Sequence, residues 1–483
     1  MNDVSARPSG TNPTYTLRRE LGRWDLTLLF VVAVLNLNTV ASIATSGPVA
    51  LWQKKTQQRS QPEPQGIAVV ELSHRYPGEG GLYLWTKELF GDFHGFIAGW
   101  AYLTTNVFYI PFVLLYLLGV GSYLGGPRAR LLMDRPLVAF PAVLCALLLI
   151  TVANVVGVGV GKWVNNLGAI GTLLAAGTLI GLSAWTFGMR GRNLHASDLV
   201  HLHLDWTLVP ALGAMCFSLI GLELASIMGD EIHNPERTLP RAIALSGIAC
   251  GLLYVATTAA LLMAMPAGQI GVVQGFVEAV ARMSGQVGLP WLLPALAIVL
   301  SVSVIGIASA WLTGAARLPF VFGLDRYLPS ALGRLHPQYK TPYVALIAQS
   351  TACALFLSMS FAGAAVKEAF VTMLDLSVVL DLVPYVYIFA AILMLTSNKK
   401  AGLHPRGRFS SYTLRTTGSV GLLTTLLAIG VVFVPSSQVG SVSLFELKMV
   451  SGSLFFLGLG TFFFHNGSRT RARGILMYRR RRE

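Results

Sequence analysis

One acidic residue, Glu223, interrupts a long apolar segment of the chain. It is the only charged residue between Trp206 and Met228, and Gly221, a poor helix former, stands two positions before it. An ionisable side chain in an apolar span is a candidate functional group, because a charge there is costly. Glu223 could take up and release a proton. A structural acid that accepts hydrogen bonds from amides at a helix break is the alternative.

A second interruption lies in the first apolar segment, "NLNTVASIATSGPVAL", where Gly47 and Pro48 stand in the interior. Proline removes a backbone donor and clashes with the preceding turn. In lipid, freed backbone groups persist only where they line a cavity or pack on protein. Interrupted helices at corresponding positions of two halves predict a transporter of inverted repeats, with its binding site near the membrane midplane.

The composition agrees with a membrane protein. The chain has 483 residues, of which 54% are hydrophobic and 12% are charged, and its mean hydropathy is +0.61. Soluble domains contain about 25% charged residues. Because lipid offers the backbone no hydrogen-bond partners, the predicted fold class is an all-α multi-pass membrane protein. The four cysteines all lie in apolar segments, which indicates packing rather than disulfides or zinc.

The apolar pattern predicts about twelve transmembrane helices. They lie near 25–51, 52–73, 93–124, 136–156, 162–188, 206–228, 242–265, 290–316, 342–362, 368–396, 413–434 and 445–464. We divide the chain into a tail (1–24), a first repeat (25–205), a second repeat (206–396), helices eleven and twelve (397–465) and a basic tail (466–483). The interrupted helices one and six would each open a repeat of five helices.

The basic residues predict the orientation. An even number of spans places both termini on one side, and most lysines and arginines then fall on that same side. The positive-inside rule therefore predicts that both termini are cytoplasmic, in a cell (inner or plasma) membrane. The net charge of +14 is explained by these basic loops, so we expect no nucleic acid partner.

The segment 53–65 departs from this pattern, because it is polar where the second helix should lie. Charged residues cost about 2.5–3.5 kcal/mol each at a helix centre, so the segment cannot lie in lipid as written. One interpretation is a local frame error in the gene or its sequencing, corrected shortly downstream. The other is a genuine hydrophilic outer loop followed by a short second helix packed against protein.

Three motifs resemble those of the amino acid–polyamine–organocation (APC) superfamily of permeases. They are "ELSHRYPGEGGLYLWTKELFG" at 71–91, "GDEIHNPERTLPRA" at 229–242 and "GAARLPFVFGLDRYLP" at 314–329. Each is moderately specific, and together, in this order, they are strongly so. The resemblance covers most of the chain. It implies a LeuT-like fold of 5+5 inverted repeats with discontinuous helices 1 and 6, and secondary transport of amino acids or related amines.

The resemblance also implies where the substrate binds. Helix one would unwind at Ala41, Ser42 and Ile43, and amides at the start of its outer half would bind the substrate carboxylate. Helix six would unwind between Ser218 and Gly221. The expected substrate-binding residues are Ala41, Ser42, Ile43, Ala44, Thr45, Asn106, Phe217, Ser218, Leu219, Ile220 and Gly221, with Glu223 as the proton-coupling residue.

Several features of the sequence leave alternatives open. Many relatives have glycines at the positions of Ala41 and Ile43, so an ordinary α-amino acid would fit less well. "ATSG" at 44–47 is similar to the glutamate/γ-aminobutyrate exchanger branch. Phe217 is either a gate over the substrate or a core residue. Asp375 and Asp381 are either cavity-facing or helix-capping acids, and Asn106 and Tyr109 either reach the cavity or join helices.

Other motifs indicate no further chemistry. "GVGVGK" at 157–162 lacks the spacing of a phosphate-binding loop, and the histidines of "HASDLVHLHLD" at 195–205 favour a solvated loop over a metal site. No catalytic arrangement is recognisable, so we expect no enzyme, cofactor or metal. The expected partners are a small-molecule substrate, the lipid bilayer, protons and a second copy of the chain in a homodimer.

The sequence therefore predicts a secondary active transporter working by alternating access, either proton-coupled or by exchange. An antiporter of an amino acid and its decarboxylation product is the alternative in the same class. A transport-inactive membrane protein or sensor, disabled at helix two, and a channel are the alternatives of a different class.

Overall fold

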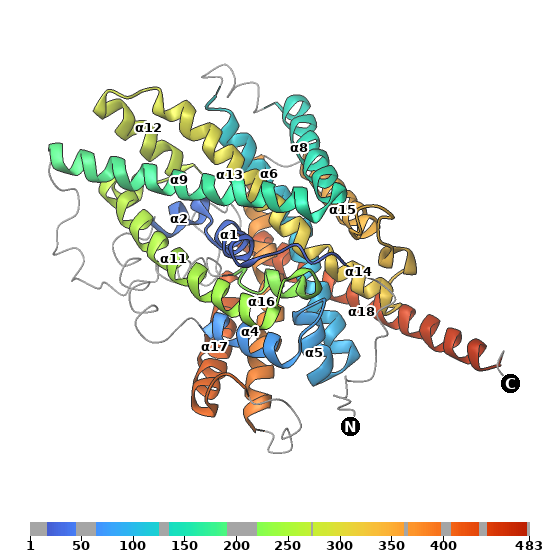
Figure 1. The fold of residues 1–483 in the computed structure, drawn as a ribbon. Helices are drawn as coiled ribbons and strands as arrows, with labels where there is room; N and C mark the ends of the chain where they lie inside the picture. Colours follow the sequence, from blue (N-terminus) through green and yellow to red (C-terminus); the bar gives the residue numbers. More distant parts are fainter. Residues whose placement is uncertain are drawn as a thin grey trace.

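The computed structural model describes residues 17–44, 64–124, 135–190, 220–271, 274–361, 366–397, 407–433 and 442–480 (Figure 1). Within these ranges the regular structure is helical, apart from two isolated β-bridges. The α-helices are α1 (Arg23–Val34), α2 (Leu37–Ala44), α4 (Pro64–Arg75), α5 (Leu82–Phe90), α6 (Asp92–Gly121), α8 (Pro136–Val156), α9 (Val158–Arg190), α11 (Pro235–Ala264), α12 (Gly275–Val287), α13 (Leu292–Ala315), α14 (Arg317–Leu324), α15 (Tyr343–Phe361), α16 (Val366–Ser397), α17 (Ser411–Val432) and α18 (Val442–Arg480). Four 3₁₀ helices complete them, η1 (Leu224–Ile227), η2 (Gly229–Glu231), η3 (Ala267–Gln269) and η4 (Ser330–Gly333).

Eight helices in the described ranges are long and apolar enough to cross a membrane, and α15 is a shorter apolar helix. The eight spans are Asp92–Gly121, Leu137–Val156, Val158–Gly188, Pro235–Ala264, Leu292–Leu324, Leu376–Ser397, Ser411–Val432 and Phe445–Arg469. The chain is thus an all-α, multi-pass membrane protein. The count of twelve and the inverted repeat stay predictions.

The first predicted span is interrupted, but earlier than the sequence suggested. α1 ends at Val34 and α2 begins at Leu37, so the break lies at Leu35 and Asn36. The prediction of a break at residues 41–43 is therefore wrong, since these residues are helical in α2. Gly47 and Pro48 lie outside the described residues.

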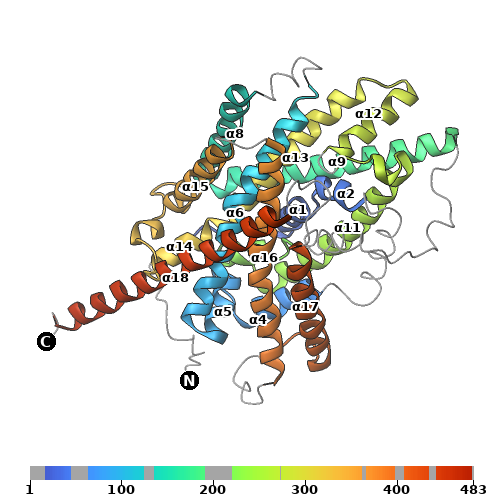
Figure 2. The same ribbon diagram turned by 180° about the vertical axis from the view of Figure 1, so that it is seen from behind.

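Two further comparisons with the predicted spans concern the residues at which helices begin and end. α4 begins at Pro64 and is only 12 residues long, and the polar segment 53–65 lies almost wholly outside the described residues. α18 extends as far as Arg480, so the predicted basic tail from residue 466 is helical up to that residue. The C-terminal part of α18 projects from the bundle, as both views show (Figures 1 and 2).

The bundle is built around α1, which packs against α9, α11 and α13. Every residue of α1 from Leu29 to Val34 is buried, so this short helix forms part of the core. α9 and α13 cross closely at Gly168 and Gly306, where a Cβ placed on either glycine would lie 2.5 Å from the other's Cα. Small residues at such crossings allow helices to pack tightly in a membrane. On the opposite side of the bundle, α16 packs against α6 and α17 (Figure 2).

Candidate functional site

Glu223 is fully buried in the structure. Its carboxylate accepts three hydrogen bonds. The Tyr102 hydroxyl of α6 donates to Oε1 at 2.8 Å, the Tyr385 hydroxyl of α16 donates to Oε2, and the Gly221 amide donates to Oε2 at 3.1 Å. We call Tyr102, Glu223 and Tyr385 the carboxylate site. Its three donors come from three separate parts of the chain, so this one side chain links α6, α16 and the turn at residues 220–223.

Gly221 explains why the backbone can turn beside this carboxylate. Its φ is +121°, a region that residues with a side chain rarely adopt. A Cβ at this position would lie 3.2 Å from Cγ2 of Val34 and 3.4 Å from the ring of Trp311. The turn at residues 220–223 therefore touches the end of α1, and these two parts of the chain meet in space although they are far apart in sequence.

The break after α1 is held by a tyrosine from α11. The Tyr254 hydroxyl donates to the Val34 carbonyl at 2.6 Å and accepts from the Asn36 amide at 3.0 Å. Tyr109 of α6 donates to the Asn36 side chain at 3.0 Å. Buried backbone groups need such partners, so Tyr254 provides the physical reason for a break at Leu35 and Asn36.

Aromatic rings pack next to the carboxylate site. The Trp311 ring of α13 lies 5.2 Å from that of Tyr109 and 6.0 Å from that of Tyr102, between centroids. Its indole nitrogen lies 3.4 Å from the Ala33 carbonyl. The carboxylate thus lies among apolar surfaces and directed hydroxyl groups.

Two buried side chains near the carboxylate site have oxygen atoms without a partner among the described residues. Neither carboxylate oxygen of Asp381 is hydrogen-bonded, and Asp381 is 1% exposed. Asn106, one helical turn after Tyr102, donates to the Tyr102 carbonyl at 2.9 Å, but its Oδ1 has no partner. Acceptors buried in this way are uncommon in folded proteins.

The residues predicted to bind substrate fall into three groups. Asn106, Ile220, Gly221 and Glu223 lie on the elements that form or adjoin the carboxylate site. Ala41, Ser42, Ile43 and Ala44 lie within α2, past the break rather than in it. The others, Thr45, Phe217, Ser218 and Leu219, lie outside the described residues. Asp375 lies in α16.

Sequence reasoning missed the hydroxyl donors. Tyr102 and Tyr385 resemble packing residues in apolar helices, and Asn36 and Tyr254 carry no motif. One signal was present, because Tyr102, Asn106 and Tyr109 recur at intervals of four and three along α6 and so share a helix face.

The three sequence motifs converge at a second polar group, made of Glu79, Glu231 and Arg317, which we call the motif cluster. The Arg317 guanidinium binds the Glu231 carboxylate through two of its nitrogens. Its Nη2 lies 2.8 Å and 2.9 Å from the two Glu231 oxygens, and its Nε lies 3.2 Å from Oε1. All three side chains are buried. The Glu79 carboxylate accepts from the Asp230 amide at 3.1 Å, so residues from three distant parts of the chain meet here.

Burial raises the pKa of Glu79 well above its ordinary value, and repulsion from Glu231 adds to this effect while Arg317 opposes it. A buried carboxyl beside a second carboxylate favours its neutral form. Backbone hydrogen bonds also fix this region, since the Glu231 carbonyl accepts from the amides of Glu20 and Leu21 at 3.0 Å and 3.1 Å.

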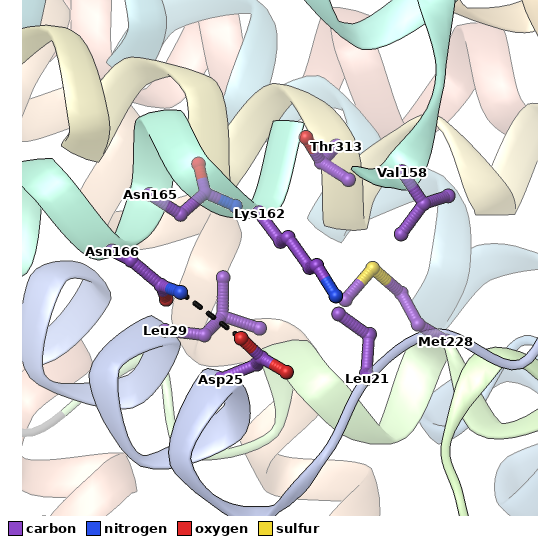
Figure 3. Close-up of a pocket in the computed structure, with 9 residues that line it drawn as sticks. All are labelled: Leu21, Asp25, Leu29, Val158, Lys162, Asn165, Asn166, Met228 and Thr313. Carbon is purple, nitrogen blue, oxygen red and sulfur yellow. Dashed lines mark hydrogen bonds between the residues drawn. The ribbon is translucent and has the colours of Figure 1, made fainter. Parts of the chain in front are cut away.

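A small pocket lies beside the start of α1, separate from the carboxylate site (Figure 3). Lys162 reaches across it and donates to the Glu20 carbonyl at 3.2 Å, and Asn166 donates to Asp25 at 3.0 Å. The lining residues are Leu21, Asp25, Leu29, Val158, Lys162, Asn165, Asn166, Met228 and Thr313. No group of three or more metal-ligating side chains occurs in the described part of the chain. The histidine-rich segment 195–205 lies outside it.

Comparison with known proteins agrees with this architecture. The model of the amino acid permease family matches residues 64–455. An uncharacterised transporter of Legionella pneumophila is 27% identical over 459 residues, covering 91% of this chain and 95% of its own length. A serine/threonine exchanger of Bacillus subtilis is 26% identical, covering 69% and 72%. A probable agmatine/putrescine antiporter of Lactococcus lactis is 22% identical, covering 82% and 84%.

These relatives are transporters rather than enzymes. The family match extends over most of the chain and includes all three motifs and the carboxylate site. The helical membrane architecture described above is the one that such a protein requires. The chain therefore belongs to the amino acid permease family, within the APC superfamily.

Proposed function

We propose that this permease moves an amino acid or a related amine by alternating access, and that Glu223 couples this movement to protons. The observation that carries the proposal is the placement of Glu223. It is buried where the two interrupted segments meet, and it accepts hydrogen bonds from α6, from α16 and from the Gly221 amide.

The carboxylate site suggests how coupling would work. An ionised carboxylate accepts hydrogen bonds at both oxygens, whereas a protonated one uses one oxygen as a donor. Protonation would therefore weaken the bonds from Tyr102 and Tyr385 to Glu223. Because these bonds link α6 and α16, their loss would allow the helices to move apart around the substrate.

The substrate carboxylate would bind at the start of α2. The first amides of a helix lack intrahelical partners and carry a partial positive charge. With the break at Leu35 and Asn36, these amides lie at Leu37 and the residue after it, a few residues before the predicted segment 41–45. Ile220 and Gly221 of the sixth segment lie near the same break, and their position supports a role in holding the substrate.

Exchange is the alternative form of coupling. The similar serine/threonine exchanger and the agmatine/putrescine antiporter have names that describe exchange. This observation favours an antiporter, including one that exchanges an amino acid for its decarboxylation product. We also propose that both termini lie on the cytoplasmic side of the cell membrane, together with the motif cluster. The proposed assembly is a homodimer.

Uptake into proteoliposomes tests the proposal. The purified protein would be reconstituted and offered labelled amino acids and amines, with and without a pH gradient and with and without unlabelled substrate inside. Uptake of one class, driven by the gradient and weakened in Glu223→Gln, is the expected result. Uptake that needs internal substrate and ignores the gradient would instead establish exchange. A monodisperse protein that transports nothing would support the inactive alternative.

A further inference from the structure

Asp381 is a buried acid that the proposed coupling mechanism does not use. It lies on α16, one turn before Tyr385, and it is 1% exposed with both carboxylate oxygens unpartnered among the described residues. One turn before it, the Ser377 carbonyl accepts from the Thr105 hydroxyl of α6 at 3.4 Å, and one turn after it, the Tyr385 hydroxyl donates to Glu223. Two acids thus face one small region between α6 and α16.

An unpaired carboxylate in this position requires an explanation. Removing a charge from water costs several kcal/mol unless a counter-ion or hydrogen bonds compensate. Glu223 has three hydrogen-bond donors, whereas Asp381 has none among the described residues. In the described chain the buried cation of the motif cluster, Arg317, is already bound by Glu231. Because no described side chain neutralises Asp381, a cation that enters with the substrate is the partner that we consider.

The neighbouring groups fit an organic cation. Asn106 Oδ1 is a second buried acceptor without a partner among the described residues, on the α6 face that carries Tyr102. The rings of Tyr102 and Tyr109 on α6 lie 6.0 Å and 5.2 Å from the Trp311 ring of α13, between centroids. Aromatic faces attract ammonium and guanidinium groups, more strongly where water is excluded. A carboxylate, an amide oxygen and aromatic rings are together a suitable set of contacts for such a group.

We propose that Asp381 determines substrate specificity by binding a cationic group at the distal end of the substrate, as found in a basic amino acid or a diamine. This inference rests on the proposed transport function and refines it. The substrate's ammonium or guanidinium group forms an ion pair with Asp381 between α6 and α16, while a carboxylate, where the substrate has one, binds at the start of α2.

Three compounds distinguish a basic amino acid from a diamine and from an amino acid with an uncharged side chain. Lysine has both a carboxylate and a distal ammonium group, cadaverine lacks the carboxylate, and norleucine lacks the distal ammonium group but keeps the chain. Uptake of each would be measured with the unaltered protein, with Asp381→Asn and with Asp381→Glu. Asp92→Asn is the matched control, because the Asp92 side chain is 49% exposed at the start of α6.

The expected result is that the unaltered protein prefers lysine or cadaverine to norleucine. Asp381→Asn should lower kcat/KM for the cationic compound about 10- to 100-fold, as expected for a lost charge-assisted hydrogen bond. Its uptake of norleucine should be unchanged or higher, Asp381→Glu should retain part of the cation uptake, and Asp92→Asn should match the unaltered protein. Preference for lysine over cadaverine would identify a basic amino acid, and the reverse a diamine.

Equal use of lysine and norleucine by the unaltered protein would overturn the inference and leave the transport proposal intact, even if Asp381→Asn did not fold. An equal loss of all compounds in Asp381→Asn would also overturn it, since a proton-carrying or structural role predicts that outcome. Ligand-induced thermal stabilisation in detergent distinguishes the two proposals. Stabilisation by lysine or cadaverine that is lost in Asp381→Asn, without any uptake, would support the cation site and count against transport.

Discussion

The Tyr102 hydroxyl of α6 lies 2.8 Å from Oε1 of Glu223, and the Tyr385 hydroxyl of α16 donates to the other oxygen of the same carboxylate. Two helices are thereby joined through one acidic side chain at the turn of the sixth segment. This relationship gives the membrane-embedded acid a mechanical role in addition to an electrostatic one.

Removing either hydroxyl should impair transport. A hydrogen bond to a charged group contributes about 1.5–3 kcal/mol, so Tyr102→Phe and Tyr385→Phe should each lower substrate uptake about tenfold or more. The measurement is the initial rate of uptake into proteoliposomes, divided by the amount of reconstituted protein. Tyr412→Phe is the control, because Tyr412 is 74% exposed on α17. Unchanged uptake in both Tyr102→Phe and Tyr385→Phe would contradict the role given to the carboxylate site.

Gly221→Ala should destabilise the protein. The new methyl group would require a positive φ of +121° and would press against Val34 and Trp311. We expect a loss of about 1–3 kcal/mol, from backbone strain and crowding, visible as a lower melting temperature in detergent.

Gly177→Ala is the matched control for this substitution. Gly177 lies in the helix α9, and a Cβ there would have no atom within 4 Å. Alanine is favoured over glycine by about 1 kcal/mol in a helix, so this variant should melt at the same or a higher temperature. If Gly221→Ala melted like Gly177→Ala, the close contact between the two interruptions would be refuted.

Replacing one partner of the buried Arg317–Glu231 ion pair should destabilise the protein more than replacing both partners by apolar residues. Arg317→Gln would leave Glu231 and Glu79 buried without their cation, at a cost of about 3–5 kcal/mol. The double variant Arg317→Met with Glu231→Leu should recover much of this loss, because apolar residues of similar size avoid the unpaired charge. Melting temperatures in detergent would show the order, with Asp92→Asn as a control at a partly exposed pair whose atoms lie 3.9 Å apart. A double variant that is no more stable than Arg317→Gln would argue against this account.

The sequence predicted the elements of the fold better than the site. Long apolar segments such as 136–156 and 290–316 agree with α8 and α13 within two residues, because hydrophobicity and length alone determine a membrane helix. Glu223 and Gly221 were also recognisable, since an acid and a glycine are both unusual in an apolar span. These features depend on local sequence.

The break after α1 and the partners of Glu223 depend instead on tertiary contacts. The break at Asn36 exists where Tyr254, more than 200 residues away in sequence, satisfies the freed backbone groups. Tyr102 and Tyr385 become functional candidates only when α6 and α16 are known to face Glu223. The same holds for Asp381, whose significance lies in the absence of a partner among the described residues, and no local pattern reports that.

The stability of the motif cluster should depend on pH through Glu79. Its ordinary pKa is 4.5, and burial, followed by repulsion from Glu231, raises the pKa in the folded protein. A group of this kind binds its proton more tightly when the protein is folded. Its contribution to stability is therefore complete below pH 4.5 and is lost as the pH rises through the raised value.

Glu79→Gln should remove this dependence, because glutamine mimics the neutral acid and can still accept from the Asp230 amide. We expect the melting temperature of the variant to equal that of the unaltered protein near pH 4 and to exceed it increasingly as the pH rises. Glu446→Gln, at an exposed position of α18, controls for the loss of a negative charge. Melting curves in detergent over this pH range provide the measurement. If the melting temperature of Glu79→Gln instead fell relative to that of the unaltered protein as the pH rose, Glu79 would be stabilised as a carboxylate. The attraction of Arg317 would then exceed the combined effects of burial and Glu231 on the pKa of Glu79.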